Sequence, residues 1–214
     1  RRCDGDDILM LMESKKIALI GTCPSSLALA PYKDESWTIW ACAENNAYGR
    51  IPRIDAWFEL HADLRWAKPA VWEEQYFKWL NAQAFDVYAQ RLDIFPKAIA
   101  FPKNEMLKEF GPYWFTSSVA WMMALAITQR PKEIGLFGVD MAARSEYGYQ
   151  KPGLMYFIDL ASRRGIEVFV PAESDLLRPP PLYGYSIGTD MGRKWHVRQL
   201  EIRARIEEVQ AKRS

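Results

Sequence analysis

One of the two histidines, His61, stands where the sequence places the end of a buried strand. The preceding run, Ile54 to Leu60, is mostly apolar and rich in β-forming residues, and Glu59 lies two residues before the histidine on the same predicted strand face. A carboxylate in that position can orient an imidazole, whose ordinary pKa suits proton transfer near neutral pH. We predict that His61 is catalytic, either transferring a proton or contacting a leaving group. A hydrogen-bonded structural histidine is the alternative.

A second group with chemical potential consists of three hydroxyl residues followed by an apolar run that reaches Ile127. These are Thr116, Ser117 and Ser118. The pattern predicts a buried helix whose first backbone N–H groups can bind a phosphate or a carboxylate. Helix capping without a ligand is the alternative reading. The apolar strand predicted next is Ile134 to Val139, which contains Gly138 and is followed by Asp140. We expect both residues at the ligand-binding edge, with Asp140 catalytic.

Two further turns are candidates for ligand contact. The first predicted strand, Ile17 to Thr22, contains Gly21 and is followed by Pro24, Ser25 and Ser26, which can begin a helix or bind a ligand oxygen. This single glycine matches neither the dinucleotide fingerprint nor the phosphate-binding P-loop. After the second strand, Asn45 and Asn46 offer paired donors and acceptors for a base edge or a sugar hydroxyl, or simply form a turn.

Strands and helical stretches alternate along the chain, which predicts an α/β fold. We expect a Rossmann-like, doubly wound, mainly parallel sheet with helices on both faces, occupying residues 1–177. The segment 103–112 is interpreted as a charged loop with one helical turn. The segment 141–153 is long and polar, contains Tyr147 and Tyr149, and is interpreted as a lid over the site.

The last part of the chain differs in composition. A proline-rich linker is predicted for residues 178–192, and an exposed C-terminal helical arm for residues 193–214. The arm has a narrow apolar side that includes Trp195, Ile202 and Ile206. We therefore expect it to pack either on the domain or on another copy of itself, the latter giving a homo-oligomer. The other histidine, His196, lies in this arm and is interpreted as a solvated or packing residue.

Composition narrows the class of protein. With 28 basic and 27 acidic residues the net charge is +1, which makes nucleic acid an unlikely partner. Three cysteines at no metal-like spacing favour a reducing compartment. No apolar run approaches the length of a membrane helix and no signal pattern is visible, so a soluble, cytoplasmic protein without membrane contact is expected.

The turn Ile20-Gly21-Thr22-Cys23-Pro24-Ser25, the Asn45–Asn46 tip, and the stretch from Ser117-Ser118 to Gly138-Val139-Asp140 resemble the bacterial sialyltransferases that use CMP-sialic acid. The same core resembles the MptE-like pterin pyrophosphokinases and the uncharacterised phage proteins grouped with them. The resemblance covers roughly Lys16 to Leu177. It implies a nucleotide-binding site made by the following residues: Gly21, Ser25, Asn45, Asn46, Ser117, Ser118 and Asp140.

The lid is where this sequence departs from the sialyltransferases. Their lid carries a histidine that acts as the base, whereas this chain has none between Asp140 and Ile166. Tyr147 and Tyr149 match the family's lid tyrosines by approximate spacing, and the resemblance implies that Tyr147 is catalytic and Tyr149 contacts the ligand.

From these observations we expect a nucleotide-dependent group transferase, glycosyltransferase-like, that takes a nucleotide-sugar donor and needs no metal. A pterin-type pyrophosphokinase using Mg²⁺ is one alternative, with oxygen and nitrogen ligands drawn from Asp55, Glu59, His61, Asp63 and Asp140. A non-catalytic nucleotide-binding or interaction module is the other. The acceptor and the identity of the nucleotide do not follow from the sequence.

Overall fold

The computed structural model describes residues 15–42, 50–62, 70–141 and 145–179, together with positions 195, 198, 199, 202, 203, 206 and 210. The chain divides into two compact units, Arg1–Leu177 and Arg178–Ser214. The predicted asparagine tip, Asn45 and Asn46, lies outside the described residues, as do Asp63 and His196.

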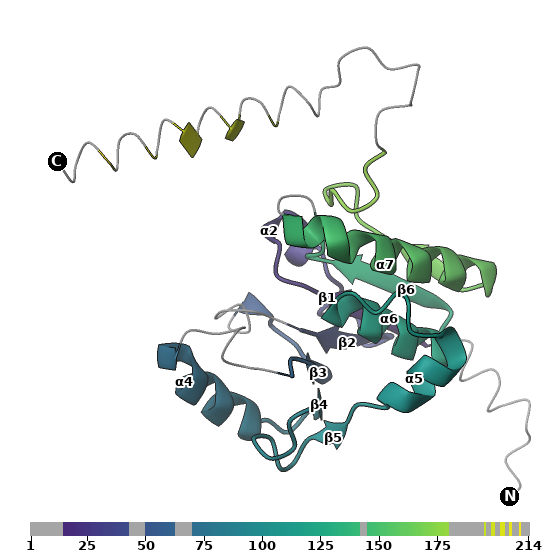
Figure 1. Ribbon diagram of the computed structural model, residues 1–214. Coiled ribbons are helices and arrows are strands. Elements are labelled where there is room, and N and C mark those ends of the chain that lie inside the picture. The colour runs from purple at the N-terminus through teal and green to yellow at the C-terminus, as the bar shows by residue number, and fades with distance from the viewer. Residues whose placement is uncertain are drawn as a thin grey trace, which may run out of the picture. The chain divides into compact units, whose positions relative to one another are not determined.

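The described strands of the first unit form one seven-stranded sheet in which every pairing is parallel (Figure 1). The strand order is β5-β4-β3-β2-β1-β6-β7. The strands are β1 (Lys16–Ile20), β2 (Trp37–Ala41), β3 (Ala56–Glu59), β4 (Asp86–Ala89), β5 (Ile99–Ala100), β6 (Glu133–Phe137) and β7 (Glu167–Phe169). The helices between them are α2 (Pro24–Leu27), α4 (Ala70–Asn81), α5 (Lys103–Phe110), α6 (Ser118–Thr128) and α7 (Ser145–Arg163). This confirms the predicted Rossmann-like α/β fold.

The sheet separates two apolar cores because successive strand side chains point to opposite faces. Ile17 and Leu19 of β1 pack with residues of α5, α6 and α7. Ala18 and Ile20 face the other way, into a core that includes residues of α2 and α4. Helices therefore cover both faces of the sheet, with α5, α6 and α7 together on one side and α4 on the other (Figure 1).

The central helix α6 is buried along most of its length, as its nearly continuous apolar sequence predicts. From Met122 to Ile127 every side chain is buried. The helix ends before Pro131, and β6 begins two residues later, beside β1. Burial on all sides fixes the position of its N-terminus relative to the sheet edge.

Two loop predictions were wrong. The segment predicted as a charged loop contains α5, which buries Met106 and Phe110 at the i, i+4 spacing of a helix face, a weak signal in an otherwise charged stretch. The predicted lid is largely helical, because α7 begins at Ser145 and continues through Pro152 to Arg163. The sequence did not predict the first two turns of this helix, because their residues are mostly polar and Pro152 follows them.

Beyond Pro179, the second unit is described at seven positions, all of them helical and exposed. Among these, Trp195, Ile202 and Ile206 are each about half exposed, at 46%, 51% and 51%. The terminal helix and the linker before it therefore remain predictions in their extent and in their role in association.

Candidate functional site

The sheet has its topological switch point between β1 and β6. The connection after β1 leads to β2 on one side, and the connection after β6 leads to β7 on the other side. The two connections therefore leave the carboxyl edge of the sheet in opposite directions. Such a divergence opens a crevice where ligands bind in doubly wound folds. The turns after β1 and β6 line this crevice.

Backbone contacts join these two turns closely. The Gly21 N–H donates to the Phe137 carbonyl at 2.8 Å, and the Cys23 N–H donates to the Gly138 carbonyl at 2.8 Å. A Cβ atom on Gly21 would lie 2.4 Å from the Gly138 oxygen. Gly138 itself has a φ of +66°, a left-handed conformation that side chains rarely adopt. Both glycines are therefore required by the approach of the two strand ends.

The two serines of the first turn act within the protein. The buried Ser26 hydroxyl accepts a hydrogen bond from the Gly138 N–H at 2.9 Å, so it holds the β6 turn and has no surface to offer a ligand. The exposed Ser25 hydroxyl donates to Asp140 Oδ1 at 2.7 Å. Neither serine lines the cavity described next, and neither does Pro24. Their visible role is to tie the β1 turn to the β6 turn.

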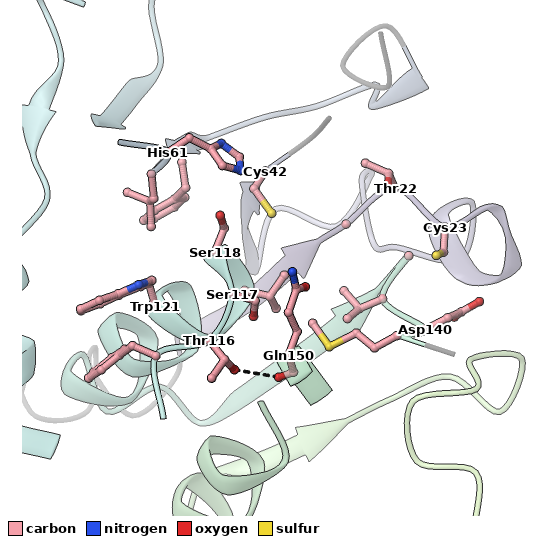
Figure 2. Close-up of a pocket in the computed structure, with 18 residues that line it drawn as sticks. Thr22, Cys23, Cys42, His61, Thr116, Ser117, Ser118, Trp121, Asp140 and Gln150 are labelled. Carbon is pink, nitrogen blue, oxygen red and sulfur yellow. Dashed lines mark hydrogen bonds between the residues drawn. The ribbon is translucent and has the colours of Figure 1, made fainter. Parts of the chain in front are cut away.

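A cavity of about 360 Å³ occupies the crevice and extends toward the end of β3 (Figure 2). That size is in the range of small-molecule sites. Its walls combine polar groups with apolar and aromatic side chains. The lining residues are Gly21, Thr22, Cys23, Cys42, Phe58, Leu60, His61, Phe115, Thr116, Ser117, Ser118, Val119, Trp121, Gly138, Val139, Asp140, Met141 and Gln150. The cavity thus brings together His61, Asp140, Gly21, Gly138 and all three predicted hydroxyl residues.

The hydroxyl residues stand at the N-terminus of α6, which meets the cavity. Ser117 is the N-cap, and its Oγ accepts from the Ala120 N–H at 3.1 Å. Ser118 is the first helical residue and lines the cavity beside it (Figure 2). Since the first backbone N–H groups of a helix lack intrahelical partners and carry the positive end of its dipole, this part of the cavity favours an anion.

His61 lines the cavity from the end of β3, in the part that Cys42 also lines (Figure 2). Its Nδ1 lies 2.5 Å from Oε1 of Glu59. The glutamate side chain is 2% exposed and the histidine 35%. The predicted carboxylate partner of the histidine is therefore present, and it lies in the protein interior while the imidazole reaches the cavity.

The start of α7 closes another wall. Thr116 Oγ1 donates to the Gln150 carbonyl at 2.9 Å (Figure 2), and a Cβ on Gly153 would lie 2.2 Å from that same Oγ1. Tyr149 is 74% exposed and is not among the lining residues. Tyr147 belongs to α7, but its side chain is outside what the structure describes. The hydroxyl of Thr116 thus fixes the loop before α6 against α7.

Cys23 is a cavity residue whose thiol pKa is raised. Burial raises its pKa, the Asp140 carboxylate raises it further, and a hydrogen bond from the Asp140 backbone partly offsets both. The thiol therefore stays protonated at neutral pH, and a protonated thiol is a poor nucleophile. Covalent catalysis through Cys23 is not favoured by this environment.

Several residues of the site were not predicted. Cys42 and Trp121 line the cavity, and Tyr76 contacts Glu59 from α4. No local pattern marks Tyr76, because its distance from Glu59 depends on how α4 packs against the sheet. Trp121 could have been predicted from its spacing, since it lies one helical turn after Ser117 and Ser118. In the structure its ring stacks on Phe115, with 3.7 Å between centroids.

The described part of the chain contains neither a cluster of metal ligands nor a membrane-spanning helix. No group of three or more metal-ligating side chains gathers there. Asp55, one of the ligands weighed for Mg²⁺, pairs with Arg53 at 2.8 Å and accepts from the Ile39 N–H. No helix among the described residues is long and apolar enough to cross a bilayer.

The chain has a Rossmann-like α/β fold with a cavity at the switch point of its sheet. Among solved structures, the chain is similar to Campylobacter jejuni CstII, a sialyltransferase in complex with the substrate analogue CMP-3FNeuAc. The identity is 19% over 73% of this chain and 79% of that one, with a TM-score of 0.50. It is also similar to the monofunctional α-2,3-sialyltransferase Cst-I of the same organism, at 18% identity over 90% of this chain and 95% of that one, with a TM-score of 0.51.

At these identities the likeness establishes the fold. No protein-family model and no curated protein sequence matches the chain.

Proposed function

We propose that this protein is a glycosyltransferase-like enzyme that binds a nucleotide-sugar in the cavity between β1, β3 and β6. The observation on which the proposal rests is the composition of that one cavity. It places the N-terminus of α6, a tight glycine turn and a carboxylate-bound histidine around a space of about 360 Å³. The similarity in fold to CMP-sugar-binding sialyltransferases supports the same assignment.

Different parts of the cavity have different roles in the proposed group transfer. The N-terminus of α6 with Ser118 binds the phosphate of the nucleotide, because unpaired N–H donors and the helix dipole favour negative charge. The aromatic side chains of Phe58, Phe115 and Trp121 offer faces against which a base or a sugar ring can pack. His61 accepts the proton of the acceptor, in place of the lid histidine of the sialyltransferases.

The reaction balances without a metal. The acceptor oxygen bonds to the anomeric carbon of the sugar, and the bond from that carbon to the phosphate oxygen breaks. The electron pair leaves with the nucleotide, and the acceptor's proton passes to His61. Asp140 lies on the far side of the cavity near the β1 turn in Figure 2, where its bond from Ser25 holds it. We assign to it the binding of donor hydroxyls.

A thermal-shift screen tests the proposal. The nucleotides are CMP, UDP, GDP and ATP, each with and without Mg²⁺, and a pterin is included. We expect at least one nucleotide to raise the melting temperature in the absence of Mg²⁺, with CMP the first candidate. Stabilisation by ATP and a pterin only when Mg²⁺ is present would instead indicate a pyrophosphokinase. No shift with any compound would contradict nucleotide binding at this site.

A further inference from the structure

The histidine of the site is the end of a buried chain of hydrogen bonds that crosses from α4 to the cavity. Trp57 Nε1 lies 2.8 Å from Tyr76 Oη, and Tyr76 Oη lies 2.5 Å from Glu59 Oε2. The other carboxylate oxygen, Oε1, lies 2.5 Å from His61 Nδ1. Trp57, Tyr76 and Glu59 are each 3% exposed or less. A network this deep is held by packing and excludes bulk water.

The direction of these bonds follows from the chemistry of the groups. An indole N–H can only donate, so the Tyr76 oxygen accepts from Trp57 and its O–H donates a hydrogen bond to Glu59. Burial, and then the charge of Glu59, raise the pKa of Tyr76 well above its usual value, so the phenol keeps that proton at neutral pH. Glu59 therefore accepts at Oε2, which favours the ionised carboxylate and an accepting Oε1.

We propose that Glu59 is the positioning residue of the site, and that it fixes His61 as the Nδ1–H tautomer so that Nε2 exchanges the substrate proton. For its catalytic meaning this inference rests on the proposed function. The role of Tyr76 and Trp57 is to hold the carboxylate in place and to share its charge. A carboxylate bound to a histidine in this way orients the ring and stabilises the imidazolium that forms during proton transfer.

Other ionisable groups near His61 enter the same balance. Cys42 lines the cavity beside it, and Tyr76 approaches from α4. Arg91, after β4, lies 3.4 Å from the Ala62 carbonyl and pairs with Asp93 at 2.6 Å. Since the Glu59 carboxylate is buried and within hydrogen-bond distance of the imidazole, we expect it to dominate the titration of His61.

The competing arrangement places the proton on Glu59. A neutral Glu59 would donate to Nδ1 and leave His61 as the Nε2–H tautomer, which could not accept a proton from a substrate at Nε2. The two arrangements have the same heavy-atom positions, so nuclear magnetic resonance is the measurement that separates them.

The experiment is a long-range ¹H–¹⁵N correlation spectrum of the full chain labelled with ¹⁵N-histidine. The sequence has two histidines, so His196→Gln assigns the remaining signal to His61. We expect the Nδ1–H tautomer at high pH. An Nε2–H tautomer would overturn the proposal whatever else is observed.

Two variants test the positioning chain without any substrate. Glu59→Gln keeps the shape of the side chain and removes its charge, so the pKa of His61 should fall by about one unit or more. Tyr76→Phe removes a donor from the carboxylate and concentrates its charge on the imidazole, so the pKa of His61 should rise. A general destabilisation of the fold would not lower the pKa of His61 in one variant and raise it in the other.

Unchanged titration of His61 in Tyr76→Phe, the milder variant, would overturn the role of the chain even if Glu59→Gln fails to fold. These spectra need no nucleotide. If no nucleotide binds but the tautomer and both shifts are as expected, the proposed function fails while the positioning by Glu59 stands. If nucleotides bind and the tautomer is Nε2–H, the reverse holds.

Discussion

Among single residues, Gly21 stands at a position where the fold leaves no room for a side chain. Its Cα faces the carbonyl oxygen of Gly138, and a Cβ would meet that backbone atom at 2.4 Å. Backbone cannot move aside as the end of a flexible side chain can, so the β1 and β6 turns would have to separate. The cavity edge formed by these turns therefore depends on a glycine at this position.

We predict that Gly21→Ala lowers the free energy of unfolding by about 1–3 kcal/mol. The matched control is Gly148→Ala in α7, where nothing lies within 4 Å of the added Cβ and where alanine is the better helix former. Chemical denaturation of the two variants and the parent measures the difference. Equal stability of both variants would contradict the close approach of the turns.

The pairing of Glu59 with His61 could be anticipated from sequence, because side chains two residues apart share a strand face. The bond from Tyr76 could not, since residues 59 and 76 meet only when α4 packs on the sheet. Similarly, Ser25 and Ser26 were expected to contact a ligand. Their bonds to Asp140 and to Gly138 join turns more than 100 residues apart, and no local pattern encodes such contacts.

At the scale of elements, the N-terminus of α6 separates two functions between neighbouring serines. Both serines line the cavity, but Ser117 Oγ accepts from the Ala120 N–H and caps the helix, whereas Ser118 is the first helical residue. The sequence predicted this helix and its start, because a hydroxyl run before an apolar stretch is typical of an N-terminus. It did not separate the cap from the residue beside it.

Substitution of each serine by alanine should therefore give different results. Ser117→Ala should lower the free energy of unfolding by about 1 kcal/mol through loss of the cap. Ser118→Ala should leave stability nearly unchanged and weaken binding of the nucleotide found in the screen by about tenfold or more, as for a lost hydrogen bond to a charged group. Calorimetric titration and thermal melts measure the two effects. The same loss of affinity in both variants, with no loss of stability in Ser117→Ala, would contradict this division.

At the scale of the whole molecule, the order and type of the main elements followed from alternating apolar runs, so the parallel sheet was predictable. The helical start of α7 was not, because its apolar contacts begin only at Leu154 and Pro152 interrupts its sequence. The chain's division at Leu177 follows a change in composition, and the last residues before it still belong to the first unit. Ser174 donates to the Val139 carbonyl at 2.7 Å, and Leu176 is fully buried.

We predict that a chain ending at Leu177 folds with nearly the parent melting temperature, whereas one ending at Val170 is clearly less stable. The shorter chain loses the bond of Ser174 and the burial of Leu176, which together are worth about 2–4 kcal/mol. If the terminal helix associates with a second copy, light scattering will show a smaller mass for the chain ending at Leu177. If the chain ending at Leu177 is insoluble, the division into two units is refuted. If it is folded but its mass is unchanged, only the association of the terminal helix is refuted.

In the proposed nucleotide-sugar site, His61 is held by Glu59 and performs proton transfer. Release of CMP from CMP-sialic acid, in the presence of sugar acceptors, tests it most directly when the parent is compared with His61→Gln. We expect turnover by the parent and a rate reduced by about 100-fold or more in His61→Gln, with CMP affinity changed little. Equal rates for the two proteins would contradict it.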